Sequence, residues 1–185
     1  TAYEITYGDW SSDVCSSDLR AGLTFEAWLF HPQLPELIEL ARALPQVSMI
    51  INHVGGILGA GPYAGHRDEI FKAWQADIRA LAQLPNLTMK LGGLGMTRCG
   101  WDFHRRAEPP GSEELAREWK PYIEACIEAF GPSRCMFESN FPVDKVSFSY
   151  NIMYNAFKRM SRGYSASERA AMFHDTAAKV YRISV

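Results

Sequence analysis

The stretch that most constrains how this chain folds is residues 47–56, which read Val-Ser-Met-Ile-Ile-Asn-His-Val-Gly-Gly. Its first half is mostly large and apolar, and turn residues flank it, with Pro45 before and Gly55 near its end. Such a short run predicts a strand buried on both faces, as in parallel sheets. His53 then falls at the carboxyl end of the strand, where ligands gather in parallel α/β folds. The alternative is a capping histidine that hydrogen-bonds a neighbouring carbonyl, and the sequence leaves both open.

Further apolar stretches predict more strands, and helical patterns separate them. The strands are expected over residues 23–30, 47–52, 87–91 and 135–139, and the helices over 34–44, 69–84, 112–130, 150–160 and 165–181. The helix over 112–130 is expected to begin with Ser112 as its N-cap. This alternation of strands and helices predicts βαβ units around a parallel sheet, so the expected fold class is α/β.

Composition narrows the class of protein. The 185 residues are 47% hydrophobic and 22% charged with a net charge of −2, which indicates one globular domain. Without a basic run, we expect no nucleic-acid partner, and without an apolar run of about 20 residues we expect no membrane partner. The four cysteines form no CxxC pair. With no export signal visible, we expect free thiols and a cytoplasmic location.

Residues 11–19 read Ser-Ser-Asp-Val-Cys-Ser-Ser-Asp-Leu and show neither helical nor strand periodicity. The string resembles a translated sequencing-library adapter, so we expect residues 1–19 to be an artefact or a non-native leader and 20–185 to be the protein proper. The alternative is an ordinary polar loop. Resequencing the source locus tests this hypothesis, and an intact gene that encodes the nine residues in frame would refute it.

Several motifs together resemble a known family. They are Leu-Phe-His-Pro-Gln-Leu-Pro-Glu-Leu (29–37), Asn-His-Val-Gly-Gly (52–56), Met-Lys-Leu-Gly-Gly (89–93), Cys-Met-Phe-Glu-Ser-Asn-Phe-Pro-Val-Asp-Lys (135–145) and Thr-Ala-Ala-Lys-Val-Tyr-Arg (176–182). In this order they are similar to the amidohydrolase-related (amidohydrolase 2) proteins, near the pyrone-dicarboxylate hydrolase and sugar-lactonase group. The implied fold is a (β/α)₈ TIM barrel. A full barrel needs about 250 residues, so residues 20–185 are expected to be its C-terminal half, truncated at the N-terminus.

The resemblance also implies site residues and a cofactor. His53 matches a histidine of the sixth barrel strand and is the tentative metal ligand. Asn140 aligns with an aspartate at the end of the eighth strand, and a neutral amide cannot act as a base. The His-x-His pair of the family's first strand does not occur in this chain. A divalent metal such as zinc is therefore one expectation, and metal-independent chemistry is the other.

A carboxylate near Asn140 is the next candidate. Side chains two apart share one face of a strand, so Glu138 is expected one layer below Asn140 and is a candidate replacement for the missing aspartate, acting through a water. The alternative is a buried glutamate paired with a cation such as Lys90.

Four further residues are candidates for substrate binding. His31 ends a predicted strand, and the alternative for it is a structural cap. Lys90 is a candidate partner of a substrate carboxylate, the alternative being a solvated or ion-paired lysine. Arg98 and Trp101 belong to a loop with His104, Arg105 and Arg106 that would lie over the site of a barrel. Such a cluster suits an anionic substrate, although a solvated loop is the plainer interpretation.

These residues together predict a hydrolase that opens a lactone-like cyclic ester of a small, anionic compound. In that prediction His53 holds a metal or polarises the carbonyl, and Asn140 with Glu138 positions the attacking water. The alternatives are a decarboxylase of the same superfamily, and an inactive fragment or binding protein that kept the pocket. Half a barrel leaves two sheet edges unpaired, which favours a homo-oligomer.

Overall fold

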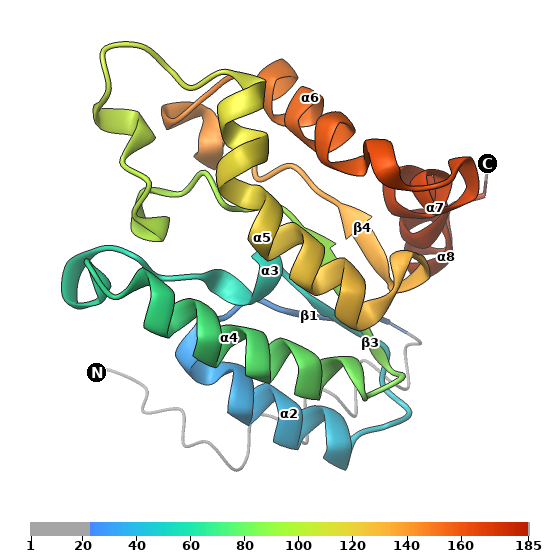
Figure 1. Cartoon of the computed structure of the whole chain (residues 1–185). Coiled ribbons are helices and arrows are strands. Elements are labelled where there is room, and N and C mark those ends of the chain that lie inside the picture. The colour runs from blue at the N-terminus through green and yellow to red at the C-terminus, as the bar shows by residue number, and fades with distance from the viewer. Residues whose placement is uncertain (1–22, 185) are drawn as a thin grey trace, which may run out of the picture.

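The computed structural model describes residues 23–184, so the predicted leader over residues 1–19 lies outside the described part (Figure 1). The elements follow one another as β1 (Phe25–Ala27), α2 (Leu34–Ala43), β2 (Met49–Ile51), α3 (His53–Gly56), α4 (Arg67–Ala82), β3 (Leu87–Leu91), α5 (Ser112–Phe130), β4 (Cys135–Phe137), α6 (Tyr150–Met160), α7 (Ala166–Ala170) and α8 (Thr176–Tyr181). Short 3₁₀ turns fill several loops, and a π-helical turn over Ala171–Asp175 joins α7 to α8.

The four strands form one parallel sheet in the order β1-β2-β3-β4. The register sets Ala27 beside Ile51, Ile51 beside Met89 and Met89 beside Cys135. The predicted α/β class with a parallel sheet is therefore confirmed. β3 has the predicted bounds, whereas the other three strands are shorter than expected: β1 ends before the turn at His31 and Pro32, β2 ends at Ile51 and β4 ends at Phe137.

The two faces of the sheet differ in chemistry. Met49, Ile51 and Met89 alternate onto one face, where they are fully buried. The helices α2, α4 and α5 form a layer along one side of the sheet (Figure 1). The other face carries the charged residues Glu26 and Lys90, which alternate with the buried positions of β1 and β3. The face toward the helices is thus apolar, whereas the other face combines these two charged residues with the buried Ile50 and Met136 that pair with them.

Most helices lie close to the residue ranges predicted for them, but the N-cap residue predicted for α5 was wrong. Helix α6 has the predicted bounds, and Ser165 caps α7 by accepting a hydrogen bond from the Glu168 amide. Ser112 was the wrong N-cap for α5, because Gly111 occupies that position and Ser112 is the first helical residue. The Ser112 hydroxyl instead accepts a hydrogen bond of 3.0 Å from Arg159 Nε on α6.

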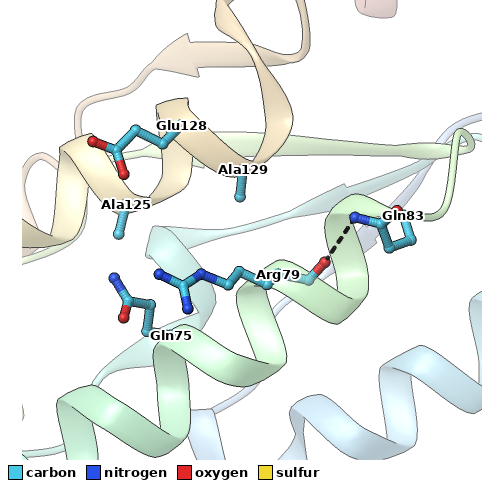
Figure 2. Close-up of a pocket in the computed structure, with 6 residues that line it drawn as sticks. All are labelled: Gln75, Arg79, Gln83, Ala125, Glu128 and Ala129. Atoms are coloured by element: carbon cyan, nitrogen blue, oxygen red, sulfur yellow. Dashed lines mark hydrogen bonds between the residues drawn. The ribbon is translucent and has the colours of Figure 1, made fainter.

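A shallow depression of 220 Å³ lies between α4 and α5, lined by Gln75, Arg79, Gln83, Ala125, Glu128 and Ala129 (Figure 2). The last turns of these helices lead into β3 and β4, so the depression is near the amino ends of the strands. It is therefore remote from the strand ends where His53 was predicted. No helix within residues 23–184 has the length and apolar character needed to cross a bilayer.

Packing of the helix layer against the sheet should contribute measurably to the free energy of unfolding. Ile78 on α4 is fully buried in the core, and Ile78→Ala removes its packing and leaves a cavity that costs about 2–5 kcal/mol. Urea unfolding followed by circular dichroism measures the loss. The matched control is Ile183→Ala, because Ile183 is 55% exposed. Equal effects of the two substitutions would contradict the assignment of α4 to the core layer.

Candidate active site

The chain turns sharply where β2 ends. His53, Val54 and Gly55 all have left-handed backbone angles, with φ of 56°, 49° and 76°. This region is rare for a β-branched residue such as Val54 and costs energy that the surrounding contacts must offset. One such contact is a hydrogen bond of 2.8 Å from Trp74 Nε1 on α4 to the Val54 carbonyl. The turn fixes the His53 side chain beside the ends of β3 and β4.

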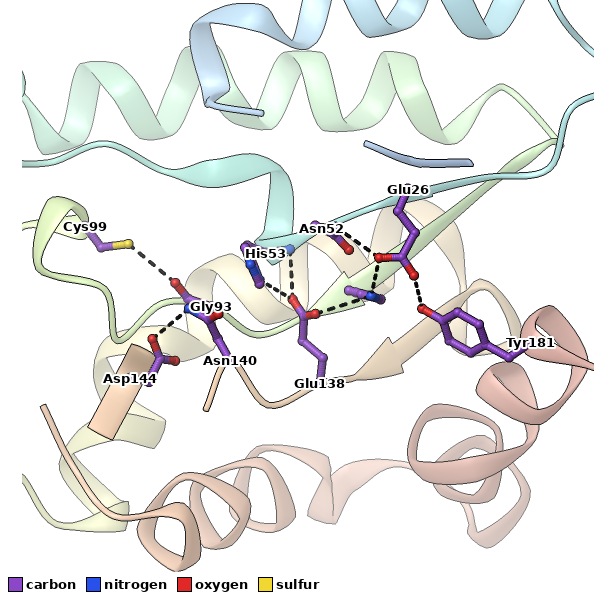
Figure 3. A network of polar contacts seen from close by, with 10 residues as sticks. Glu26, Asn52, His53, Gly93, Cys99, Glu138, Asn140, Asp144 and Tyr181 are labelled. Carbon is purple, nitrogen blue, oxygen red and sulfur yellow. Dashed lines mark hydrogen bonds and ion pairs between the residues drawn. The ribbon is translucent and has the colours of Figure 1, made fainter. Parts of the chain in front are cut away.

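His53 bonds the carboxylate of Glu138, the residue after β4, through two groups. Its ring Nδ1 lies 2.6 Å from Glu138 Oε1, and its backbone N–H donates to the same oxygen at 2.9 Å (Figure 3). Both side chains are about nine-tenths buried, with 12% and 11% exposed. A carboxylate at Nδ1 fixes the ring's orientation and favours the tautomer with its proton on Nδ1. Nε2 is then the nitrogen left for chemistry.

Two glycines of the loop after β3 make room for this pair. A Cβ at Gly93 would lie 2.4 Å from the His53 ring, and a Cβ at Gly92 would lie 2.6 Å from Glu138 Cγ. These distances are far below an ordinary van der Waals contact of about 3.5–4.0 Å. The Gly-Gly sequence after β3 is therefore needed for His53 and Glu138 to meet.

The second Glu138 oxygen belongs to a wider charge network. Lys90 Nζ lies 3.8 Å from Glu138 Oε2 and 2.9 Å from Glu26 Oε2. Glu26 also accepts hydrogen bonds from Tyr181 Oη on α8 and from Asn52 Nδ2 (Figure 3). Burial by itself lowers the pKa of Lys90, but the bonds to Tyr181 and Glu26 and the Glu138 charge raise it above its usual value. Lys90 is therefore a cation held between two carboxylates.

Asn140 lies close by but bonds a different group. Its Nδ2 donates to Asp144 Oδ1 at 3.0 Å, and the fully buried Asp144 leaves its other oxygen, Oδ2, without a hydrogen-bond partner in the described part of the chain. Burial raises the pKa of Asp144 to about 6, although the Asn140 hydrogen bond and the His53 charge oppose the rise. Asp144 is thus a buried carboxyl group beside the candidate residues.

The structure brings four of the predicted residues together. His53, Glu138 and Lys90 are joined by direct contacts, and Asn140 lies at the same end of the sheet beside Asp144 (Figure 3). The Glu138–Lys90 ion pair is the alternative that the sequence left open, and the contact with His53 accompanies it. The roles of these residues in catalysis remain predictions.

The other predicted residues lie apart from this network. His31 Nδ1 accepts a hydrogen bond of 3.2 Å from the Leu58 amide, and burial lowers the His31 pKa, as a structural cap would require. The Arg98 guanidinium lies 5.1 Å from the ring centre of Phe30. Trp101 lies under a different arginine, with 4.3 Å between its ring centre and Arg67. Substrate contacts by His31, Arg98 and Trp101 remain predictions.

Sequence reasoning missed three members of the site: Glu26, Asp144 and Tyr181. The sequence does mark Glu26 as a candidate site residue, since it is the one charged residue in the mainly apolar strand predicted over 23–30. No sequence pattern marks Tyr181 as a site residue, because its partner Glu26 is 155 residues away in the sequence. Asp144 lies in the loop after Pro142, where no local pattern predicts burial, whereas the fold buries it fully.

The described residues do not by themselves fit a metal ion. Within residues 23–184 there is no group of three or more His, Cys, Asp or Glu side chains arranged to hold one. His53 has its Nδ1 committed to Glu138, which leaves one nitrogen as a ligand. The nearby Cys99 is buried, and burial raises its thiol pKa to about 12, so it offers no thiolate.

A parallel sheet with a histidine–carboxylate pair at its carboxyl end defines an α/β protein whose site lies on the loops after the strands. The chain belongs to the amidohydrolase family, because the family model described as amidohydrolase matches residues 19–183. The family inferred from the sequence motifs is thereby confirmed.

Known relatives share most of this chain. An uncharacterized protein, y4mH of Sinorhizobium fredii, is 43% identical over 164 residues, which cover 89% of this chain and 48% of that protein. An L-fucono-1,5-lactonase of Burkholderia multivorans is 29% identical over 160 residues, covering 86% of this chain and 51% of the lactonase. The chain thus spans about half the length of the curated relatives it matches.

A solved structure supports the fold. An amidohydrolase of Burkholderia multivorans with bound zinc superimposes with a TM-score of 0.81 at 27% identity. The match covers 96% of this chain and 58% of that structure. The described sheet and helices are therefore similar to a large part of an amidohydrolase structure.

The buried Asp144 should make the free energy of unfolding depend on pH. Its folded pKa of about 6 lies above its ordinary value of 3.8, so the folded state holds this proton more tightly than the unfolded state does. The free energy of unfolding should therefore fall as the pH rises from about 4 to 6 and then level off, with a loss of about 2–3 kcal/mol from this group. Urea titrations at several pH values measure it.

Asp144→Asn should remove this fall, because an amide does not titrate yet still accepts the bond from Asn140. The matched control is Asp68→Asn, since Asp68 is exposed on the first turn of α4. A wild-type protein and an Asp144→Asn variant with the same pH dependence would show that Asp144 is not the group responsible.

Proposed function

We propose that this chain is the catalytic part of a hydrolase that opens a lactone-like cyclic ester of a small, anionic compound. The observation that carries the proposal is the His53–Glu138 pair, with 2.6 Å between Nδ1 and Oε1 at the carboxyl end of the sheet. The L-fucono-1,5-lactonase relative supports the reaction class. A histidine oriented by a carboxylate is a general way to activate a nucleophile.

His53 is the proposed proton carrier. With its Nδ1 proton directed at Glu138, the neutral ring accepts a proton at Nε2 from a water molecule as the water oxygen attacks the lactone carbonyl. The Glu138 charge stabilises the imidazolium that forms. Collapse of the tetrahedral intermediate breaks the ring C–O bond, and Nε2 returns the proton to the leaving oxygen. The product is the open hydroxy acid.

Asn140 has a positioning role in this proposal. One Nδ2 hydrogen is donated to Asp144, which fixes the amide plane and sets the direction of Oδ1. A carbonyl oxygen in this position accepts a hydrogen bond from the attacking water without taking its proton. The neutral amide thereby orients the water, while His53 supplies the base.

We further propose that residues 20–185 form the C-terminal half of a (β/α)₈ barrel and that residues 1–19 are a non-native leader. Four parallel strands are half of the eight that a barrel needs, and the zinc-bound relative extends well beyond the matched part. The outer edges of β1 and β4 pair with no other strand among the described residues. Such edges favour association with the rest of a barrel or with a second copy.

The cofactor and the location are two further proposals. The zinc in the amidohydrolase of Burkholderia multivorans supports a divalent metal in the complete enzyme. Because residues 23–184 lack a three-ligand group, the mechanism proposed here requires only His53, Glu138 and Asn140. We propose a cytoplasmic enzyme with reduced thiols, in keeping with the free cysteines Cys99, Cys126 and Cys135.

The test is hydrolysis by the complete gene product of a neutral lactone, L-fucono-1,5-lactone, and of an anionic one, carboxyphthalide. His53→Gln should lower kcat by about 10²–10⁴-fold, because proton transfer in the transition state is lost. Glu138→Gln should lower it less, since the ring keeps its Nε2 but loses the charge that stabilises the imidazolium. Metal content is measured on the same samples, and carbon dioxide release would identify a decarboxylase instead.

His66→Gln is the matched control, because His66 is exposed and its ring bonds the exposed Glu69 in the described chain. Circular dichroism confirms that each variant is folded. Full activity in a folded His53→Gln variant would refute the mechanism, and a complete protein that turns over no lactone would refute the function.

A further inference from the structure

Lys90 is enclosed by other charged and aromatic groups. Its side chain is 15% exposed, and its ammonium lies 2.9 Å from Glu26 Oε2 and 3.8 Å from Glu138 Oε2. The ring centre of Tyr181 lies 5.6 Å from the same nitrogen. Lys90 also lies within β3, one residue before the strand ends. A substrate carboxylate that approached this nitrogen would therefore meet two carboxylates that already balance its charge.

Glu26 is itself held by two further groups. Tyr181 Oη on α8 donates to its Oε1, and Asn52 Nδ2 donates to its Oε2 at 3.3 Å (Figure 3). Burial by itself raises the pKa of Glu26, but the bonds from Tyr181, Lys90 and Asn52 and the Lys90 charge hold it below its ordinary value. Glu26 is thus an anion with a fixed position, and it anchors the Lys90 ammonium.

The Glu138 carboxylate needs a contact on each oxygen to keep one orientation. The last torsion of a glutamate side chain is broad, so the carboxylate rotates readily when one oxygen has no contact. Oε1 accepts both bonds from His53, and the Lys90 ammonium faces Oε2. Lys90 therefore restricts the rotation that would carry Oε1 away from the His53 ring.

We propose that Lys90 is a positioning residue, which acts on the reaction through Glu138 and does not contact the substrate. The proposal rests on the proposed lactone hydrolysis at His53, and it gives Lys90 a different role from the substrate ligand expected from the sequence. Anchored by Glu26, the ammonium keeps Glu138 Oε1 on the His53 ring. The ring in turn keeps Nε2 directed at the attacking water.

The kinetic test compares Lys90 variants of the complete gene product on the neutral L-fucono-1,5-lactone and the anionic carboxyphthalide. Lys90→Met should lower kcat by about 10- to 100-fold on both, because a misplacement of about 1 Å costs up to about 100-fold. The ratio of the two KM values should stay the same, since Lys90 does not touch the substrate. Lys90→Arg should restore most of kcat, because it keeps a cation between the two carboxylates.

Lys120→Met is the matched control, because Lys120 forms an exposed ion pair with Glu124 on α5, at 3.4 Å. Equal losses of kcat in the Lys90→Met and Lys120→Met variants would overturn the proposal. A rise in the KM of carboxyphthalide relative to that of the neutral lactone would identify Lys90 as a substrate ligand and would overturn it as well.

A second variant separates loss of positioning from loss of folding. Lys90→Met leaves Glu26 and Glu138 without the cation they share, which destabilises the fold. Adding Glu26→Gln removes one of the two like charges and should restore stability, as measured by urea unfolding. The kcat of this double variant should stay low, because Glu138 still has no cation at Oε2. Recovery of kcat together with stability would show that Lys90 only supports the fold.

A measurement without turnover separates this proposal from the proposed function. The ¹⁵N chemical shifts of the His53 ring, recorded at alkaline pH, distinguish its two neutral tautomers. The wild-type protein and Lys120→Met should show the form with its proton on Nδ1, and Lys90→Met should show a mixture. A change of tautomer in a protein that hydrolyses no lactone would refute the function and retain the positioning role. Hydrolysis in which neither kcat nor the tautomer depends on Lys90 would refute the positioning role and retain the function.

Discussion

The contact between His53 and Glu138 is the interaction on which the candidate site depends, because it joins two strands that are not neighbours. β2 and β4 are separated by β3, and adjacent strands lie about 4.8 Å apart. The pair spans this gap only where β3 gives way to Gly92 and Gly93, since a Cβ at either position would collide with it. The left-handed turn at His53 then directs both the backbone N–H and the ring toward the same carboxylate oxygen. A histidine held by two bonds in a mostly buried position has little freedom to change tautomer or orientation.

Charge balance explains why the polar face of the sheet is stable beside this pair. Lys90 stands between Glu26 and Glu138, so partly buried carboxylates and a cation offset one another. Removing one member of such a group leaves an uncompensated charge, which is why networks of this kind act as units. Tyr181 extends the network to α8 through Glu26 and thereby ties the last helix to the chemistry of the strands. Asp144 is the exception, because burial without a cation in contact raises its pKa.

The sequence supported predictions where a local pattern carries the information. Apolar strands and amphipathic helices predicted the parallel α/β class. The prediction that Glu138 and Asn140 share a strand face was less accurate, because β4 ends at Phe137 and both residues lie in the loop after it. The Glu138–Lys90 contact was one of two alternatives, and it coexists with the bond to His53. Arg98 and Trp101 looked like parts of one cluster because they are three residues apart, but they contact different partners, Phe30 and Arg67. Proximity in a loop says little about direction, since loop backbones have no repeat that orients successive side chains.

By itself, the sequence determined the parallel α/β class, most of the strands and helices, the family, and four residues at the carboxyl ends of the strands: His53, Lys90, Glu138 and Asn140. These follow from periodicity and motif spacing, which are properties of neighbouring residues. Only the tertiary structure decided that Glu138 bonds His53, that Tyr181 bonds Glu26, and that Asp144 is buried with one oxygen unpartnered. Each of these depends on groups brought together by strand register and helix packing. Their energies depend on burial, which exists only after the chain has folded.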